Sequence, residues 1–219
     1  MDLPFTVEQF TTVFERYNLA VWPAQILLGA LGLIAVVLAA RPRPHFGRIV
    51  SLILGFFWIW MGLVYHLRFF AAINPAAHGF AALFALQGTA FLIVGTARGD
   101  LSFRYRQDIQ GVTGALVLAY ALVVYPLLGI LFGHVYPAAP TFGLPCPTTI
   151  YTFGLLLWTG RKFPRLILAI PLIWSVIGFS AALTLGMVED TGLLVAGLAA
   201  TALIIRRDRS ERASLSPMH

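Results

Sequence analysis

The chain has 219 residues, of which 59% are hydrophobic and 11% charged, and its formal net charge is +6. Soluble domains carry about 25% charged residues, so a soluble fold could not bury this much apolar surface, and lipid must be the solvent. The basic residues lie in short loops between apolar runs, which is not the pattern of a nucleic-acid-binding protein, and we expect no nucleic-acid partner.

The first predicted element is a short helix near the N-terminus. The sequence Thr-Val-Glu-Gln at positions 6–9 has the form of a capping box. Four apolar residues from Phe10 to Tyr17 then follow at the i, i+3, i+4, i+7 spacing of one helical face. We therefore predict an interfacial helix within residues 1–17 that lies on the outer surface of the membrane.

Seven apolar segments follow this helix. A helix needs about 20 residues to span the hydrocarbon core, and all but the fifth and seventh segments meet that length. The segments cover residues 18–40, 48–71, 77–98, 109–132, 147–161, 166–187 and 191–206. We predict an all-α, polytopic membrane protein in which residues 18–206 form a bundle of seven transmembrane helices.

The positive charges indicate how the bundle is oriented. If the chain crosses seven times, 13 of the 15 basic residues fall on one side, and only Arg16 and Arg68 fall on the other. Because Lys and Arg accumulate in cytoplasmic loops, this distribution predicts an outside N-terminus and a cytoplasmic C-terminus. Residues 207–219 would then form a basic cytoplasmic tail, which we expect to be disordered.

A weak internal repeat relates two of the predicted helices. Phe46-Gly47-Arg48 precedes Trp58, and Phe163-Pro164-Arg165 precedes Trp174 at nearly the same distance. If the repeat is real, helices 1–3 and 5–7 are related, and helix 4 links them.

The fifth segment is interrupted at its start by Pro145-Cys146-Pro147. A proline suits the first turn of a helix and biases the preceding residue toward extended geometry, so we expect the helix to begin at Pro147. Its 15 residues to Arg161 would reach only about 22 Å, short of the roughly 30 Å core. Broken helices of this kind line binding sites in transporters. The alternative is a tight surface loop that leads into a short, tilted helix.

Ionisable groups are concentrated on the predicted outer side, where each is a candidate for function because such groups are costly in a bilayer. The candidate ligand-binding residues are His66, Arg68, His78, His134, Cys146 and Thr148. A metal could instead be held by His66, His78, His134, Cys146, Glu189 and Asp190. In the simplest alternative the histidines bond water or backbone at the interface, and Arg68 extends to the headgroups rather than binding an anion.

Five short motifs are Phe5 to Phe10, Tyr17-Asn18, Trp22-Pro23, Asn74 to Ala77, and Gly143 to Thr149. Together they resemble a family of bacterial integral membrane proteins that is known only as a domain of unknown function. The resemblance implies a multi-pass protein of the bacterial inner (cytoplasmic) membrane. It implies no activity, because none is established for that family.

Three functions fit these observations. The first is a transporter of a small solute or ion with an outward-facing site, and the second is a membrane-embedded metalloenzyme that uses outer histidines and carboxylates. The third is a non-catalytic subunit that packs against other proteins or a second copy through Ala77, Ala81 and Ala85. We assign no catalytic residue, and the sequence identifies no cofactor.

Overall fold

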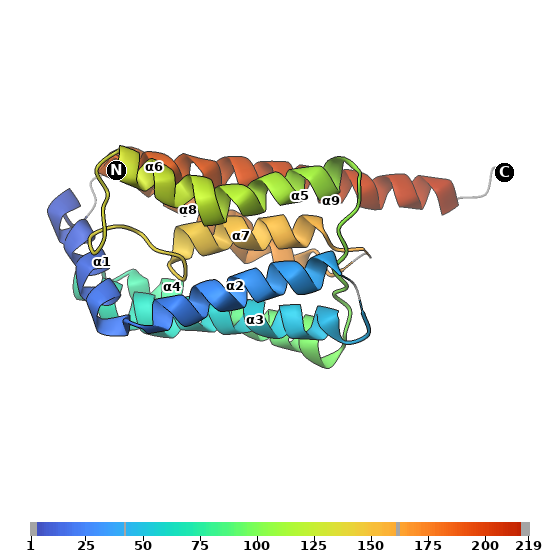
Figure 1. Cartoon of the computed structure of the whole chain (residues 1–219), viewed down its shortest axis with the longest axis horizontal. Helices are drawn as coiled ribbons and strands as arrows, with labels where there is room; N and C mark the ends of the chain where they lie inside the picture. The colour runs from blue at the N-terminus through green and yellow to red at the C-terminus, as the bar shows by residue number, and fades with distance from the viewer. Residues whose placement is uncertain (1–3, 42, 161–162, 216–219) are drawn as a thin grey trace.

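The computed structural model of the protein describes residues 4–41, 43–160 and 163–215. Within these ranges the chain is helical, with two isolated β-bridges and no β-strand, which confirms the all-α prediction. Most of the helices run along one axis and pack side by side (Figure 1).

Nine α-helices make up the described part of the bundle, and several continue into π-helical or 3-10 turns. The helices are α1 (Val7–Val21), α2 (Ala24–Ala40), α3 (Phe46–Trp60), α4 (Ala77–Ala90), α5 (Ile109–Ala119), α6 (Tyr125–Leu131), α7 (Pro145–Leu157), α8 (Leu166–Leu185) and α9 (Thr191–Leu215). The other turns are η1 (Met61–Phe69), η2 (Phe70–Ala72), η3 (Phe91–Ala97), η4 (Tyr120–Val124) and η5 (Val188–Asp190).

Helix α1 lies across one end of the bundle, which we call the α1 end (Figure 1). Its predicted capping box is present, because the side chains of Thr6 and Gln9 each accept a hydrogen bond from the other's backbone N–H. The chain then bends by 89° between Val21 and Ala24. The predicted first segment, residues 18–40, is therefore divided between α1 and α2.

Five helical segments are long and apolar enough to cross a membrane, and α1 with α2 would add a sixth if counted as one bent span. The five are Phe46–Ala72, Ala77–Ala97, Ile109–Leu131, Leu166–Leu185 and Val188–Ser210. The structure thus supports a multi-pass membrane protein. Seven spans and the N-out orientation stay predictions, since α7 is not among these segments.

Helix α7 starts earlier and ends earlier than expected. It begins at Pro145 and has 13 residues, which is about 20 Å of helix. The prediction that no helix includes Cys146 is therefore wrong. Both prolines fit in the first turn of α7, because the N–H groups of that turn have no partner within the helix and proline lacks this group. Arg161, where we expected the helix to end, lies outside the described residues, as does Lys162.

The shortness of α7 is explained by its position in the middle of the bundle (Figure 1). Every residue of α7 except Cys146 is buried, and the helix packs against α5 and α9. On its other side the Tyr151 hydroxyl donates to the Gly32 carbonyl of α2 at 2.7 Å. Trp58 of α3 donates to the Thr152 hydroxyl at 3.1 Å. Other helices therefore surround α7, and the Tyr151 and Thr152 hydroxyls bond protein groups.

Small residues bring α3 and η1 into close contact with α4. A Cβ on Gly88 would lie 2.7 Å from the Gly55 carbonyl oxygen, and one on Gly62 would lie 2.8 Å from that of Ala81. Ala77 and Ala81 are themselves buried in this packing. Two of the three alanines that we expected to contact a partner protein therefore contact the rest of this chain.

We expect Gly88→Leu to lower the melting temperature of the detergent-solubilised protein strongly. The new Cβ would lie 2.6 Å from Ile59 Cγ1 as well as against the Gly55 carbonyl, and overpacking of this kind costs about 1–3 kcal/mol or more when backbone must move. Gly29→Leu is the matched control, because nothing lies within 4 Å of a Cβ there. Equal melting temperatures of the two variants would contradict this account of the packing.

The opposite end of the bundle is held by charged residues of α9. Arg207 donates to the Thr159 carbonyl at 2.6 Å, and Asp208 pairs with Arg207 at 3.1 Å and with Arg165 at 3.7 Å. The chain stays helical as far as Leu215, so the expectation of a disordered tail from residue 207 is wrong for 207–215. Residues 216–219 lie outside the described part.

Candidate functional site

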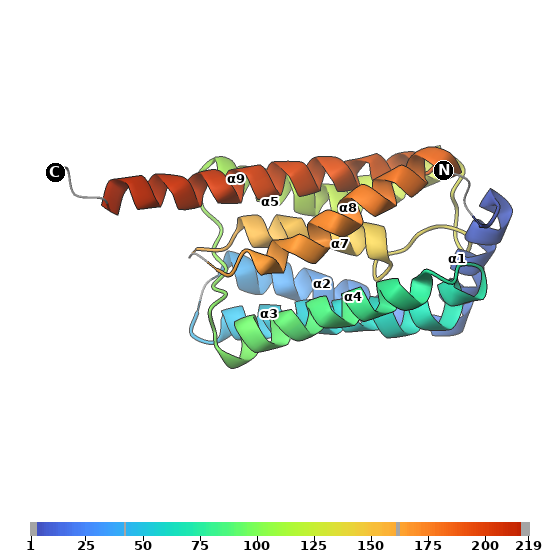
Figure 2. The ribbon, with the colours of Figure 1, turned by 180° about the vertical axis from the view of Figure 1, so that it is seen from behind.

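A cavity of about 190 Å³ lies at the α1 end, between α1, η1, α8 and the start of α7. Seen from behind, α8 runs between α4 and α9 toward the α1 end (Figure 2). Seven of the lining residues are aromatic, and most of the others are aliphatic or proline. The aromatic residues are Phe5, Phe10, Phe14, Tyr65, Phe70, Phe80 and Trp174.

His66 is the least satisfied polar group of this cavity. Its side chain lies on the π-helical turn η1 and is fully buried, with 0% of its surface exposed. Its ring contacts those of Phe84, with centroids 4.6 Å apart, and Trp174, at 5.1 Å. Neither ring nitrogen has a hydrogen-bond partner within the described residues. Because an unpaired buried polar group costs free energy, this residue is a candidate for binding a ligand.

Asp190 is the one acidic residue among the described residues that line the cavity. It lies where η5 joins α9, is 5% exposed, and accepts a hydrogen bond from the Tyr125 hydroxyl at 2.5 Å. The Cys146 thiol lies beside this carboxylate. The cavity therefore combines an aromatic wall with a single acidic group.

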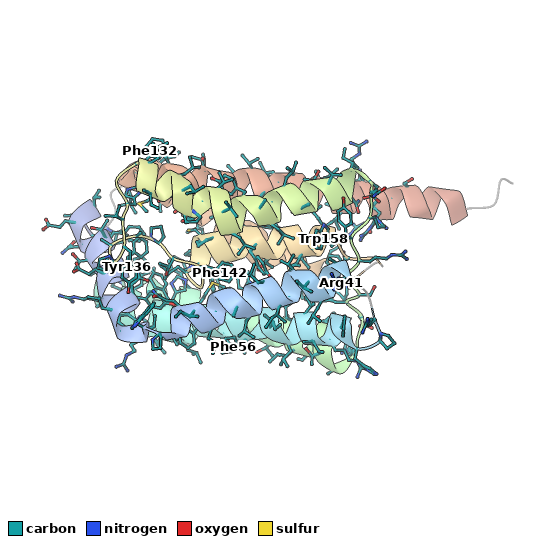
Figure 3. The ribbon with its side chains drawn as sticks, in the orientation of Figure 1. Arg41, Phe56, Phe132, Tyr136, Phe142 and Trp158 are labelled. Atoms are coloured by element: carbon teal, nitrogen blue, oxygen red, sulfur yellow. The ribbon has the colours of Figure 1, made fainter. Side chains whose placement is uncertain are left out.

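The segment from Phe132 to Leu144 enters the bundle before α7 begins. Figure 3 shows Tyr136 at the α1 end and Phe142 close to α7 and α2. The Phe142 ring packs on Tyr151 at 5.1 Å and on Phe57 at 5.4 Å between ring centroids. This segment carries Pro140 and Leu144 to the cavity wall.

Asn18 of α1 supplies the hydrogen bonds that this non-helical segment needs. Its amide nitrogen donates to the carbonyls of Pro137 at 2.6 Å and Ala139 at 2.8 Å. Its amide oxygen accepts from Gln25 at 2.6 Å and Thr141 at 2.8 Å. Irregular backbone is tolerated at membrane depth only when its polar groups are satisfied, so Asn18 stabilises this part of the site.

We expect Asn18→Leu to loosen residues 132–144 while the bundle stays folded. The substitution leaves the Pro137 and Ala139 carbonyls without their donor, and each loss costs about 1–3 kcal/mol. Hydrogen exchange should rise at least tenfold in residues 132–144 and stay unchanged in α3. Thr11→Val, which removes a hydroxyl that bonds only within α1, is the control. Unchanged exchange in Asn18→Leu would contradict the assigned role.

The structure brings only some of the predicted ligand-binding residues together. His66 and Cys146 both line the cavity, and the Thr148 hydroxyl instead accepts from the Gly143 N–H at 3.0 Å. Arg68 is exposed and lines a different pocket. His78 is exposed, and its ring bonds the Pro75 carbonyl at 3.1 Å.

The six predicted metal ligands do not converge. No group of three His, Cys, Asp or Glu side chains that could hold a metal ion occurs in the part of the chain that the structure describes. His134 instead pairs with the buried carboxylate of Glu189 at 2.8 Å. A metalloenzyme therefore has no support in this arrangement.

Sequence reasoning missed most of the aromatic wall. The spacing of Phe10 and Phe14 predicts the apolar face of an N-terminal helix that could gate an outer site, but it does not predict that these rings line the cavity. The sequence pattern relates Trp174 only to Trp58, through the weak repeat. No feature of the sequence indicated that these rings and His66 meet.

The comparison with known protein families covers nearly the whole bundle. A model described as a family of unknown function (DUF6064) matches residues 7–215. The chain belongs to this family. No curated protein and no solved structure matches the chain. Apart from Phe5, every residue that lines the cavity falls within the matched part.

Proposed function

We propose that the protein binds a small organic cation with apolar substituents in the aromatic cavity and transports it across the membrane. The observation that carries the proposal is the lining, in which seven aromatic residues surround a site whose single acidic residue, among those described, is Asp190. The proposal narrows the hypothesis of a small-solute transporter to one class of solute.

The electrostatics of the lining favour a cation. The faces of aromatic rings are negative, and each attracts a desolvated cation by up to about 2 kcal/mol. A buried carboxylate gains from a positive partner, because an uncompensated charge at low dielectric is costly. His66 supplies a ring nitrogen for a hydroxyl or N–H of the ligand, since no described residue uses either nitrogen.

The start of α7 does not favour an anion, although helix N-termini often bind one. Pro145 and Pro147 have no N–H, and the Thr148 N–H donates to the Leu144 carbonyl at 3.2 Å. Only the Cys146 N–H of these four residues is left for a ligand. The first turn of α7 therefore contributes little positive potential, too little to outweigh the Asp190 carboxylate and favour an anion.

The size of the cavity suits a ligand of a few heavy atoms. A cavity of about 150 Å³ is enough to hold benzene, and this one measures about 190 Å³. In the predicted N-out orientation the site would face the outside, with Phe10 and Phe14 of α1 as its cover. Movement of α1 would then admit the solute, and α7 would close the path toward the cytoplasm.

The test uses choline and 3,3-dimethyl-1-butanol, which share shape and hydroxyl group but differ in charge. We expect calorimetric titration of the purified chain to give at least tenfold tighter binding of choline. Radiolabelled choline should also accumulate in liposomes that contain the protein, saturably and above protein-free liposomes.

Each outcome bears on one part of the proposal. Equal binding of the two compounds, or tighter binding of the alcohol, would overturn the assignment to cations. Binding of neither would overturn the cavity as a site for this class of ligand. Binding without uptake would overturn transport and leave a membrane-embedded binding protein.

A further inference from the structure

A second pocket, of about 380 Å³, lies on another face of the α1 end, between α1 and the η1–η2 turns. Its polar lining comes from two elements that are distant in sequence. From α1 come Glu8, Gln9, Thr12 and Arg16, and from η1 comes Arg68. The two arginines are the same two that the charge distribution set apart from the other 13 basic residues.

The two guanidinium groups are available to a ligand. Both side chains are exposed, and neither Arg16 nor Arg68 forms an ion pair or hydrogen bond within the described ranges. Glu8 is the one acidic residue of the pocket, so the lining has a net charge of +1. A monoanion would neutralise it.

The position and chemistry of the pocket indicate a phosphate group. If α1 lies at the membrane surface, as its sequence predicts, the pocket would be at the level of the lipid phosphates. Guanidinium groups bind phosphate oxygens in pairs of parallel hydrogen bonds. The Gln9 amide oxygen is engaged by the Thr6 N–H, which leaves the Gln9 NH₂ and the Thr12 hydroxyl as further donors.

We propose that Arg16 and Arg68 together hold a phosphate group in this pocket, either the headgroup phosphate of a phospholipid or a soluble phosphate. This site is separate from the aromatic cavity and does not depend on the function proposed for it. A bound lipid here would fix α1 against η1, which carries His66 on its other side.

The test measures lipid retention by native mass spectrometry of the full chain in a non-ionic detergent. We expect phosphatidylglycerol to be retained and diacylglycerol with the same acyl chains to be lost. Arg16→Gln with Arg68→Gln should reduce retention at least tenfold. Arg41→Gln with Arg104→Gln removes the same charge and should retain the lipid. Both arginines are exposed; Arg41 lies at the opposite end (Figure 3), and the Arg104 N–H donates to the Trp158 carbonyl just after α7. Arg68→Lys should weaken retention severalfold, because lysine keeps the charge but not the paired geometry.

A calorimetric titration with inorganic phosphate separates the two sources. Phosphate binding that depends on Arg16 and Arg68, without lipid retention, would support a soluble phosphate. Retention of diacylglycerol equal to that of phosphatidylglycerol would overturn the proposal, as would equal losses in the test and control double variants. Failure of both probes to bind the wild-type chain would overturn it as well.

Discussion

Asp190→Asn should weaken choline binding at least thirtyfold while binding of 3,3-dimethyl-1-butanol changes less than threefold. Removing one member of a desolvated charge pair costs about 2–5 kcal/mol, and every 1.4 kcal/mol is tenfold in affinity. Asparagine has nearly the same shape, and its amide oxygen can still accept from Tyr125. The variant should therefore fold, and parallel titrations with the two compounds give the comparison.

Asp100→Asn is the matched control for this prediction. Asp100 is an exposed residue of the opposite end, and its substitution removes the same charge. We expect wild-type affinity for both compounds. If Asp190→Asn binds choline as well as the control does, Asp190 does not supply the counter-charge, and the preference for cations loses its basis.

His66→Phe should weaken choline binding about tenfold and leave the melting temperature unchanged or higher. Phenylalanine keeps the ring packing against Phe84 and Trp174, so the volume of the cavity is largely preserved. It removes two buried nitrogens that have no partner in the described structure, and an unsatisfied buried polar group costs about 1–3 kcal/mol. A residue that lowers stability in the empty protein and raises affinity for a ligand has a functional role.

His78→Phe is the control here, because His78 is exposed at the start of α4 and bonds only the Pro75 carbonyl. We expect no change in choline affinity. A large drop in melting temperature for His66→Phe would mean that the imidazole stabilises the fold, and unchanged affinity would remove it from the binding site. Thermal unfolding in detergent and calorimetric titration measure the two quantities independently.

The features that the sequence predicted best are those that depend on the spacing of nearby residues. The capping box at Thr6 and Gln9 and the apolar face of α1 follow from intervals of three and four residues, and both are present. The apolar runs predicted the long helices for the same reason. The proline pair around Cys146 located the irregular entry to α7, although the helix begins two residues earlier than predicted.

The site was harder to predict because its residues meet only through tertiary packing. His66 and Arg68 are two residues apart, yet one lines the aromatic cavity and the other the pocket beside Arg16. Side chains two residues apart on a helix point to nearly opposite faces, and the hydropathy pattern does not reveal which element packs against each face. Trp174 and Asp190 come from different elements that converge at the α1 end. Polarity alone also could not distinguish Asn18, which holds a loop, from residues that face a ligand.

Arsenocholine, which has the shape and charge of choline and scatters X-rays anomalously, tests the central claim most directly. Crystals of the full chain soaked with it should give one strong arsenic peak in the aromatic cavity. The peak should lie within about 6 Å of the centres of the lining rings, the range of cation–π contacts, and beside the Asp190 carboxylate. An empty cavity with arsenic bound elsewhere on the protein would contradict the account.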